Sequence, residues 1–283
     1  MILGMLSIPS YACLNSYDEL SSTYRDDLQH FKNKNDRNYF YRNKLKEFVK
    51  KHPQPKSVEE KNDYAVQLIY NYEYSKAINI LLDIEKIKPN LAKTAVNLGT
   101  AYELNGDLDK AEFWISKGIK LDSTIHHGSE WIHLNILKAK KNNETLKWYE
   151  DHPLLGFRYG HGYSPIEVNK GDRWDKVRDI SGQGRLQLSE RRKFIYGEDY
   201  SVARLAYELS NLEEIYAQSD ELKYRLGYPN VNSKVFMDIA LYHGLEQGKT
   251  EIKRIKYLGS DSFIYRFILM VIDYISGIFP KGR

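Results

Sequence analysis

The stretch Ile-His-His-Gly-Ser-Glu-Trp-Ile-His gathers the residue types that could hold a metal ion. It contains His126, His127, Glu130 and His133, and His161 follows further along the chain. Imidazole nitrogens and carboxylate oxygens are common zinc ligands. The spacing differs from the His-Glu-x-x-His helix of zinc enzymes, and the His-His pair falls in an expected loop. We therefore expect no metal and no cofactor, while a metal-dependent enzyme stays an alternative that requires these residues to converge.

The sequence carries no other recognisable catalytic motif. It has no G-x-S-x-G, G-x-G-x-x-G or P-loop pattern. Asp172, Asp175 and Asp179 alternate with basic residues, which is typical of an exposed, ion-paired helix. The single cysteine, Cys13, excludes an internal disulfide and a cysteine-based zinc cluster. We predict that the chain is not an enzyme.

Composition indicates a folded chain without a strong electrostatic preference. The 283 residues are 42% hydrophobic and 28% charged, which allows a large core. The formal net charge of +4 is too small to argue for nucleic-acid binding by itself.

A repeat of 34 residues organises the middle of the chain. Ala77 and Ala111 lie 34 residues apart in similar surroundings, and Ala65 stands where Gly99 stands in the second unit. Since glycine costs a helix stability relative to alanine, Gly99 predicts a close approach of two helices. The positions that define the repeat are Ala65, Ala77, Pro89, Leu98, Gly99, Tyr102 and Ala111.

The turn residues fit helical hairpins. Asn105 and Gly106 suit the end of a helix. Asp107 or Asp109 can cap the next helix, and Asp109 with Glu112 has capping-box spacing. In the first unit, we expect Ser75 to cap the second helix and Pro89 to stop it.

These residues resemble the tetratricopeptide repeat over about 58–124, with a degenerate third unit up to 152. The resemblance implies an all-α fold: a helical-hairpin solenoid with additional helical flanks. Repeats of this type bind partners along the inner surface formed by the first helix of each hairpin. The inner-surface residues that the resemblance implies are Asn62, Val66, Ile69, Tyr70, Lys93, Asn97, Thr100, Glu103 and Leu104.

The inner surface predicts a protein-interaction scaffold whose partner is an unknown protein or peptide. Family members that grip a chaperone's C-terminal carboxylate use Lys and Asn where this chain has Asn62 and Val66. A chaperone tail is therefore not the expected ligand, and an extended or helical peptide suits the mixed lining better. In the alternative interpretation, these residues pack against the N-terminal helices of the same chain, which occupy the groove themselves.

The flanks divide the rest of the chain. We expect an N-terminal helical pair over 14–57, the repeat array over 58–152, and a loop followed by helical hairpins over 153–257. A basic run from His30 to Lys56 includes Tyr39, Phe40 and Tyr41. Its interpretation as a solvated amphipathic helix is favoured, so no nucleic acid is expected; binding of nucleic acid or anionic lipid is the alternative.

Both ends of the chain suggest a bacterial cell envelope. Residues 1–13 form an apolar run ending in Ser-Tyr-Ala-Cys, typical of a signal or lipoprotein-type segment, although the basic start is missing. Within 258–283, residues 263–279 reach the lower length limit of a membrane span, with Arg266 and Asp273 opposing insertion. We expect a periplasmic or envelope location with a possible membrane anchor, and a cytoplasmic location as the alternative.

Overall fold

A computed structural model describes residues 14–16, 34–142, 149, 151–157, 173–195, 198–219, 235–236 and 239–240. Every regular element in these residues is a helix, so the predicted all-α fold class is confirmed. None of the helices in these ranges has both the length and the apolar composition needed to cross a membrane. The expected signal segment 1–13 and the expected anchor 263–279 lie outside the described residues.

The chain divides into two compact units. The first comprises Met1–Gly156 and Asp179–Tyr196, and the second comprises Phe157–Arg178 and Gly197–Arg283. The sequence places residues 179–196 with the C-terminal part, whereas here they group with the first unit. The boundary between the units at Arg178 and Asp179 falls within one helix. The helices are α1 (Lys34–Lys51), α2 (Val58–Tyr70), α3 (Tyr74–Ile87), α4 (Ala92–Leu104), α5 (Leu108–Leu121), the short 3-10 helix η1 (Ile125–Gly128), α6 (Glu130–Lys141), α8 (Arg173–Arg192) and α9 (Tyr200–Ser219).

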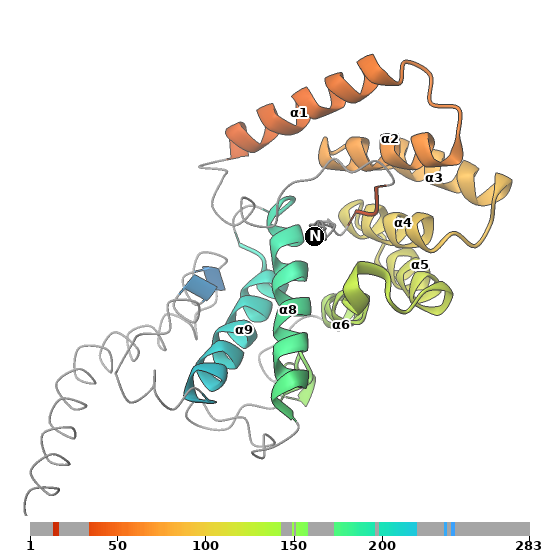
Figure 1. The fold of residues 1–283 in the computed structure, drawn as a ribbon. Coiled ribbons are helices and arrows are strands. Elements are labelled where there is room, and N and C mark those ends of the chain that lie inside the picture. Colours follow the sequence, from red (N-terminus) through yellow and green to blue (C-terminus); the bar gives the residue numbers. More distant parts are fainter. Residues whose placement is uncertain are drawn as a thin grey trace, which may run out of the picture. The chain divides into compact units, whose positions relative to one another are not determined.

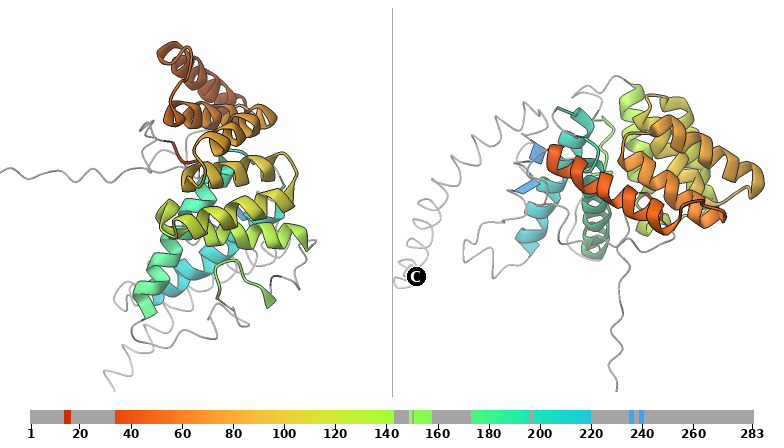
Figure 2. Two further views of the ribbon diagram at one scale, coloured as in Figure 1. Left: turned by 90° about the vertical axis from the view of Figure 1, so that its right-hand side faces the viewer. Right: turned by 90° about the horizontal axis from the view of Figure 1, so that it is seen from above.

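Helices α1 to α6 of the first unit follow one another in space as they do in sequence. Each packs against the helix before it, as Figures 1 and 2 show. Three residues separate α2 from α3 and α4 from α5, so these pairs are helical hairpins. The structure therefore places two hairpins side by side, with α1 on one side and α6 on the other.

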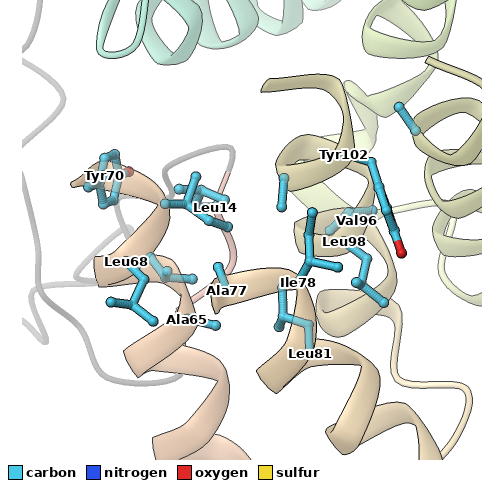
Figure 3. Close-up of a cluster of buried hydrophobic side chains, with 14 of the residues drawn as sticks. Leu14, Ala65, Leu68, Tyr70, Ala77, Ile78, Leu81, Val96, Leu98 and Tyr102 are labelled. Atoms are coloured by element: carbon cyan, nitrogen blue, oxygen red, sulfur yellow. The ribbon is translucent and has the colours of Figure 1, made fainter. Parts of the chain in front are cut away.

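The core of the first unit forms where apolar residues recur at helical spacing. In α3 the buried side chains are Ala77, Ile78, Leu81 and Ile84, which is one face of a helix. Figure 3 shows these layers, with side chains of α2, α3 and α4 directed toward one another. Leu14, far from them in sequence, belongs to the same buried cluster.

Two glycines permit close contact between α4 and α5. A Cβ atom added at Gly99 would lie 2.5 Å from Cγ1 of Ile115 and 3.0 Å from its backbone nitrogen. A Cβ added at Gly118 would lie 2.4 Å from Cγ1 of Val96. Each glycine thus faces a β-branched residue of the other helix, and this is the close approach that the position of Gly99 predicts.

Side chains cap the first turns of α2 and α5. The side chain of Ser57 accepts a hydrogen bond from the Glu60 backbone in a complete capping box. Asp107 caps α5 by accepting from the backbone of Lys110, so the alternative cap at Asp109 is wrong. Gly106 has a φ of +87°, as expected for a glycine that ends a helix.

The cap expected for α3 is wrong as well. Its N-cap residue is Glu73, whose side chain makes no capping hydrogen bond, and Ser75 already lies inside the helix. The Ser75 hydroxyl instead lies 3.4 Å from the Asn105 amide oxygen of the neighbouring hairpin. The helix does end at Ile87, two residues before Pro89.

Helix α8 begins at Arg173, so Asp175 and Asp179 lie on a helix as their spacing predicts, and it runs through Gly182 and Gly184. Helix α9 begins after Asp199, whose side chain accepts from the backbone of Val202. Asn211 is buried within α9 and donates to the Tyr207 carbonyl.

Candidate functional site

A short N-terminal segment of the chain, residues 14–16, occupies the face of α2 and α4 on which the expected binding residues lie. The Asn15 backbone N–H donates to Oδ1 of Asn97 at 2.8 Å. The Asn15 carbonyl accepts from Nδ2 of Asn62 at 2.7 Å and from Nδ2 of Asn97 at 3.2 Å. Both polar backbone groups of one residue are therefore satisfied by two amide side chains, which we call the asparagine pair.

The asparagine pair is itself ordered by a direct contact. Nδ2 of Asn97 donates to Oδ1 of Asn62 at 3.0 Å, and both residues are fully buried. Since an unsatisfied buried amide costs about 1–3 kcal/mol, this arrangement requires a polar backbone group at the place of Asn15. The pair binds main-chain atoms, because its hydrogen bonds go to the backbone N–H and C=O of Asn15.

Neighbouring contacts extend this recognition along the segment in both directions. Nζ of Lys93 lies 3.1 Å from the Ser16 carbonyl. Leu14 is 1% exposed and belongs to the same apolar cluster as Val66 and Ile69. By contrast, Nδ2 of Asn15 and Oγ of Ser16 are buried and have no hydrogen-bond partner within the part of the chain that the structure describes. The segment is thus held through its backbone and one apolar side chain.

The other end of the face is covered by the end of α8. The ring of Phe194 stacks on Tyr70 with centroids 5.1 Å apart. Arg191 reaches Glu103 with two nitrogens, at 2.8 Å and 3.3 Å. Two more side chains of α8 make hydrogen bonds to the same unit: Gln183 accepts from Trp131, and Gln187 donates to Ser129. Gln183, Gln187 and Arg191 lie at four-residue intervals, so they lie on one face of α8.

A buried charge cluster lies where α4, α6 and α8 meet. Glu103 also accepts from Lys140 at 3.0 Å, and its second oxygen lies 2.6 Å from Nε2 of His133. Nδ1 of His133 lies 3.1 Å from Glu130, which is bonded to Nδ1 of His126 as well. Both ring nitrogens of His133 therefore face carboxylates, so the charged imidazolium form suits this position.

The electrostatics of the cluster agree with this protonation. Burial opposes ionisation of Glu103, but Arg191, Lys140 and His133 hold its pKa well below the ordinary value. Burial also opposes the charge of Glu130, yet the two histidines lower its pKa to about 2. For His133, burial is outweighed by the Glu103 carboxylate, so its pKa is raised.

The histidine stretch forms ion pairs in place of a metal site. Among the described residues, no group of three or more His, Cys, Asp and Glu side chains is arranged to hold a metal ion. His126, Glu130 and His133 do converge, but through hydrogen bonds that occupy the Glu130 carboxylate and both nitrogens of His133. His127 is exposed, and His161 lies outside the described residues.

The structure brings together the residues expected on the inner surface, but it does not leave them open. Asn62, Asn97 and Lys93 contact residues 14–16, whereas Glu103 binds Arg191. The remaining expected residues are buried or half-buried in the described structure: Val66, Ile69, Tyr70, Thr100 and Leu104. The alternative expectation named the N-terminal helices as the occupant, whereas the occupant is the non-helical segment 14–16, and Arg191 was not expected either. The only signal for Arg191 was the four-residue spacing of polar residues on α8.

The basic run is partly structural. Arg37 of α1 is fully buried, lies over the rings of Tyr41 and Tyr72, and donates to the Tyr70 carbonyl. Tyr41 stacks on Tyr70 with centroids 4.3 Å apart. Arg37 and Tyr41 are therefore not available to nucleic acid or lipid, and Tyr39 is the aromatic residue of α1 that is 72% exposed.

Comparison with protein-family models, curated proteins and solved structures finds no match to this chain.

Proposed function

We propose that this chain is a tetratricopeptide-like interaction scaffold, not an enzyme, and that its α2/α4 face binds a short non-helical peptide segment of a partner protein. The observation that carries the proposal is the asparagine pair, which satisfies both polar backbone groups of Asn15. Repeat-hairpin proteins use such faces for binding. A partner segment would place its own backbone N–H and C=O where those of Asn15 lie.

The chemistry of the pair favours a peptide over other ligand classes. Each asparagine side chain has an amide group that donates and an oxygen that accepts, and neither asparagine carries a charge that would select a phosphate or a carboxylate. Lys93, the nearby cation, contacts a main-chain carbonyl. A peptide backbone meets all of these groups at once.

Selection of displayed random peptides tests the proposal. The full-length protein and its Leu14→Asp variant serve as targets. Peptides that also bind the Asn97→Asp version of each target are removed, so that the peptides that remain depend on Asn97. Asn97→Asp keeps the acceptor for a backbone N–H but removes the donor to a backbone carbonyl, so we expect it to abolish binding of the selected peptides. Asn79→Ala, a change of an exposed residue of α3, is the control and leaves binding unchanged.

If neither target yields peptides that depend on Asn97, the proposed function is wrong. Peptides that depend on Asn97 and are unaffected by Asn79→Ala support it.

The location of the protein is a separate proposal that rests on the sequence of its two ends. We propose an envelope protein processed near Cys13 and attached through 263–279. Mass spectrometry of the mature protein from its host should find a start near Cys13, and carbonate extraction should leave it in the membrane pellet. Recovery of an intact Met1 in the cytosolic fraction would contradict export.

A further inference from the structure

We propose that residues 14–16 are an intrachain stand-in for the ligand, so that the α2/α4 face accepts a leucine-x segment, with x no larger than asparagine and not proline, only when residues 14–16 leave. This inference rests on the proposed function and names both the ligand class and the regulation of the same face. Its basis is the set of contacts that hold Leu14, Asn15 and Ser16.

The contacts show which features of a bound segment the face recognises. It recognises an aliphatic side chain at the position of Leu14, which is 1% exposed within the apolar cluster. Figure 3 shows this side chain among those of α2, α3 and α4. At the next position it requires a backbone N–H that donates to Oδ1 of Asn97, and proline has no such N–H.

The side chains that follow Leu14 contribute no comparable recognition. Among the described residues, Nδ2 of Asn15 and Oγ of Ser16 have no hydrogen-bond partner. Because main-chain atoms are the same in every residue, another segment with leucine in the place of Leu14 offers the same backbone groups. Asn15 is 4% exposed, so the position after Leu14 is limited in size but is not selected by a side-chain hydrogen bond.

The connection to the rest of the chain makes residues 14–16 a strong competitor. Residues 14–16 belong to the same chain as the face that they occupy. An external ligand must therefore compete with an intramolecular contact, which has the advantage of a high effective concentration. The apparent affinity of an external peptide is therefore reduced by the fraction of molecules in which the face is open.

The decisive experiment uses a labelled peptide with the sequence of residues 11–19, in which Cys13→Ser prevents oxidation. Its binding is measured by fluorescence anisotropy to the full-length wild-type protein and to its Leu14→Asp variant. We expect the variant to bind at least about tenfold more tightly, since losing the burial of one leucine shifts the balance by such a factor.

Changes in the peptide test the specificity. Asn15→Ala in the peptide should leave its affinity within about twofold, because the Asn15 amide nitrogen has no partner. Asn15→Pro in the peptide should abolish binding, since it removes the N–H that Asn97 accepts. Leu14→Asp in the peptide should abolish binding as well.

Equal affinity of the peptide for wild type and for Leu14→Asp would overturn the inference, as would binding that survives Asn97→Asp in the protein. If displayed peptides bind through Asn97 while the residue 11–19 peptide does not, the inference fails and the proposed function stands. Failure of both sets of peptides removes both.

Folding of the variant is checked by its thermal transition, with Asn15→Pro in the protein as a second way to open the face. If both variants unfold at the growth temperature, residues 14–16 are part of the core, and the inference is overturned.

Discussion

The guanidinium of Arg191 meets the carboxylate of Glu103 with two nitrogens, at 2.8 Å and 3.3 Å, across 88 positions of sequence. The side chains of Arg191 and Glu103 are 7% and 6% exposed, so the pair is largely removed from water. This contact joins the last turn of α8 to α4 and explains why residues 179–196 belong to the first unit. Because both carboxylate oxygens of Glu103 are bonded to Arg191, Glu103 stabilises the fold and is already engaged when a ligand arrives.

Replacement of Arg191 should therefore destabilise the first unit strongly. Arg191→Met leaves a carboxylate nearly buried with one compensating charge fewer, and loss of a partner from a buried pair costs about 3–5 kcal/mol. Arg191→Lys keeps the charge but loses the two-pronged geometry, so we expect a smaller loss. Urea denaturation measures both. An Arg191→Met protein as stable as wild type would show that the pair contributes nothing to folding.

The stability contributed by His133 should depend on pH with a definite sign. Its pKa is raised above the ordinary 6.5 despite burial, because Glu103 and Glu130 face its two nitrogens, while Arg191 opposes the shift. The stabilisation is therefore complete below pH 6.5 and is lost as the pH rises through the raised pKa. Above it, the neutral ring can donate to only one of the two carboxylates.

The comparison of wild type with His133→Gln measures this effect. We expect the variant to be less stable by about 1.5–3 kcal/mol near pH 6, the range for hydrogen bonds to charged groups, and the gap to narrow toward pH 9. A gap that is constant from pH 6 to 9 would contradict an imidazolium at this position.

Glu130 predicts the opposite dependence at acid pH. Burial raises its pKa, but His126 and His133 outweigh burial and lower the pKa to about 2. Its contribution is complete above the ordinary value of 4.5 and is lost as the pH falls toward 2. Glu130→Gln should therefore unfold at lower temperature than wild type at pH 6, and the two curves should converge near pH 2. Thermal melts followed by circular dichroism decide this.

Much of the fold could be predicted from the recurrence of small residues in the 34-residue repeat. The small residues Ala65, Ala77, Gly99 and Ala111 located the two hairpins, because helices that pack closely need small side chains at the contact. The same reasoning could not predict the packing of helix α8. Gln183, Gln187 and Arg191 of α8 make polar contacts to Trp131, Ser129 and Glu103. Its two glycines are also more typical of a loop than of a helix. A stripe of polar contacts has no signature in hydrophobic spacing.

The candidate site could be predicted as a surface but not as an occupied one. The expected resemblance to the tetratricopeptide repeat placed Asn62 and Asn97 on one face of the array. That Asn15 would fill this face depends on contacts across 47 and 82 positions, which no local pattern encodes. The same holds for the cluster of Glu103 and His133, whose partners come from three helices.

The contact between α4 and α5 gives the sharpest test of the hairpin arrangement, because the chain offers a matched control. Glycine to alanine in a helix ordinarily stabilises by about 0.5–1 kcal/mol. At Gly182 of α8 an added Cβ meets nothing within 4 Å, so Gly182→Ala should show this gain. At Gly99 the same Cβ would lie 2.5 Å from Ile115, so Gly99→Ala should gain less or destabilise. Gly99→Leu should lose at least about 1–3 kcal/mol through overpacking. A gain at Gly182 together with a smaller gain or a loss at Gly99 would locate the close contact at Gly99, whereas equal stabilisation by both alanine variants would mean that α4 and α5 do not pack through this residue.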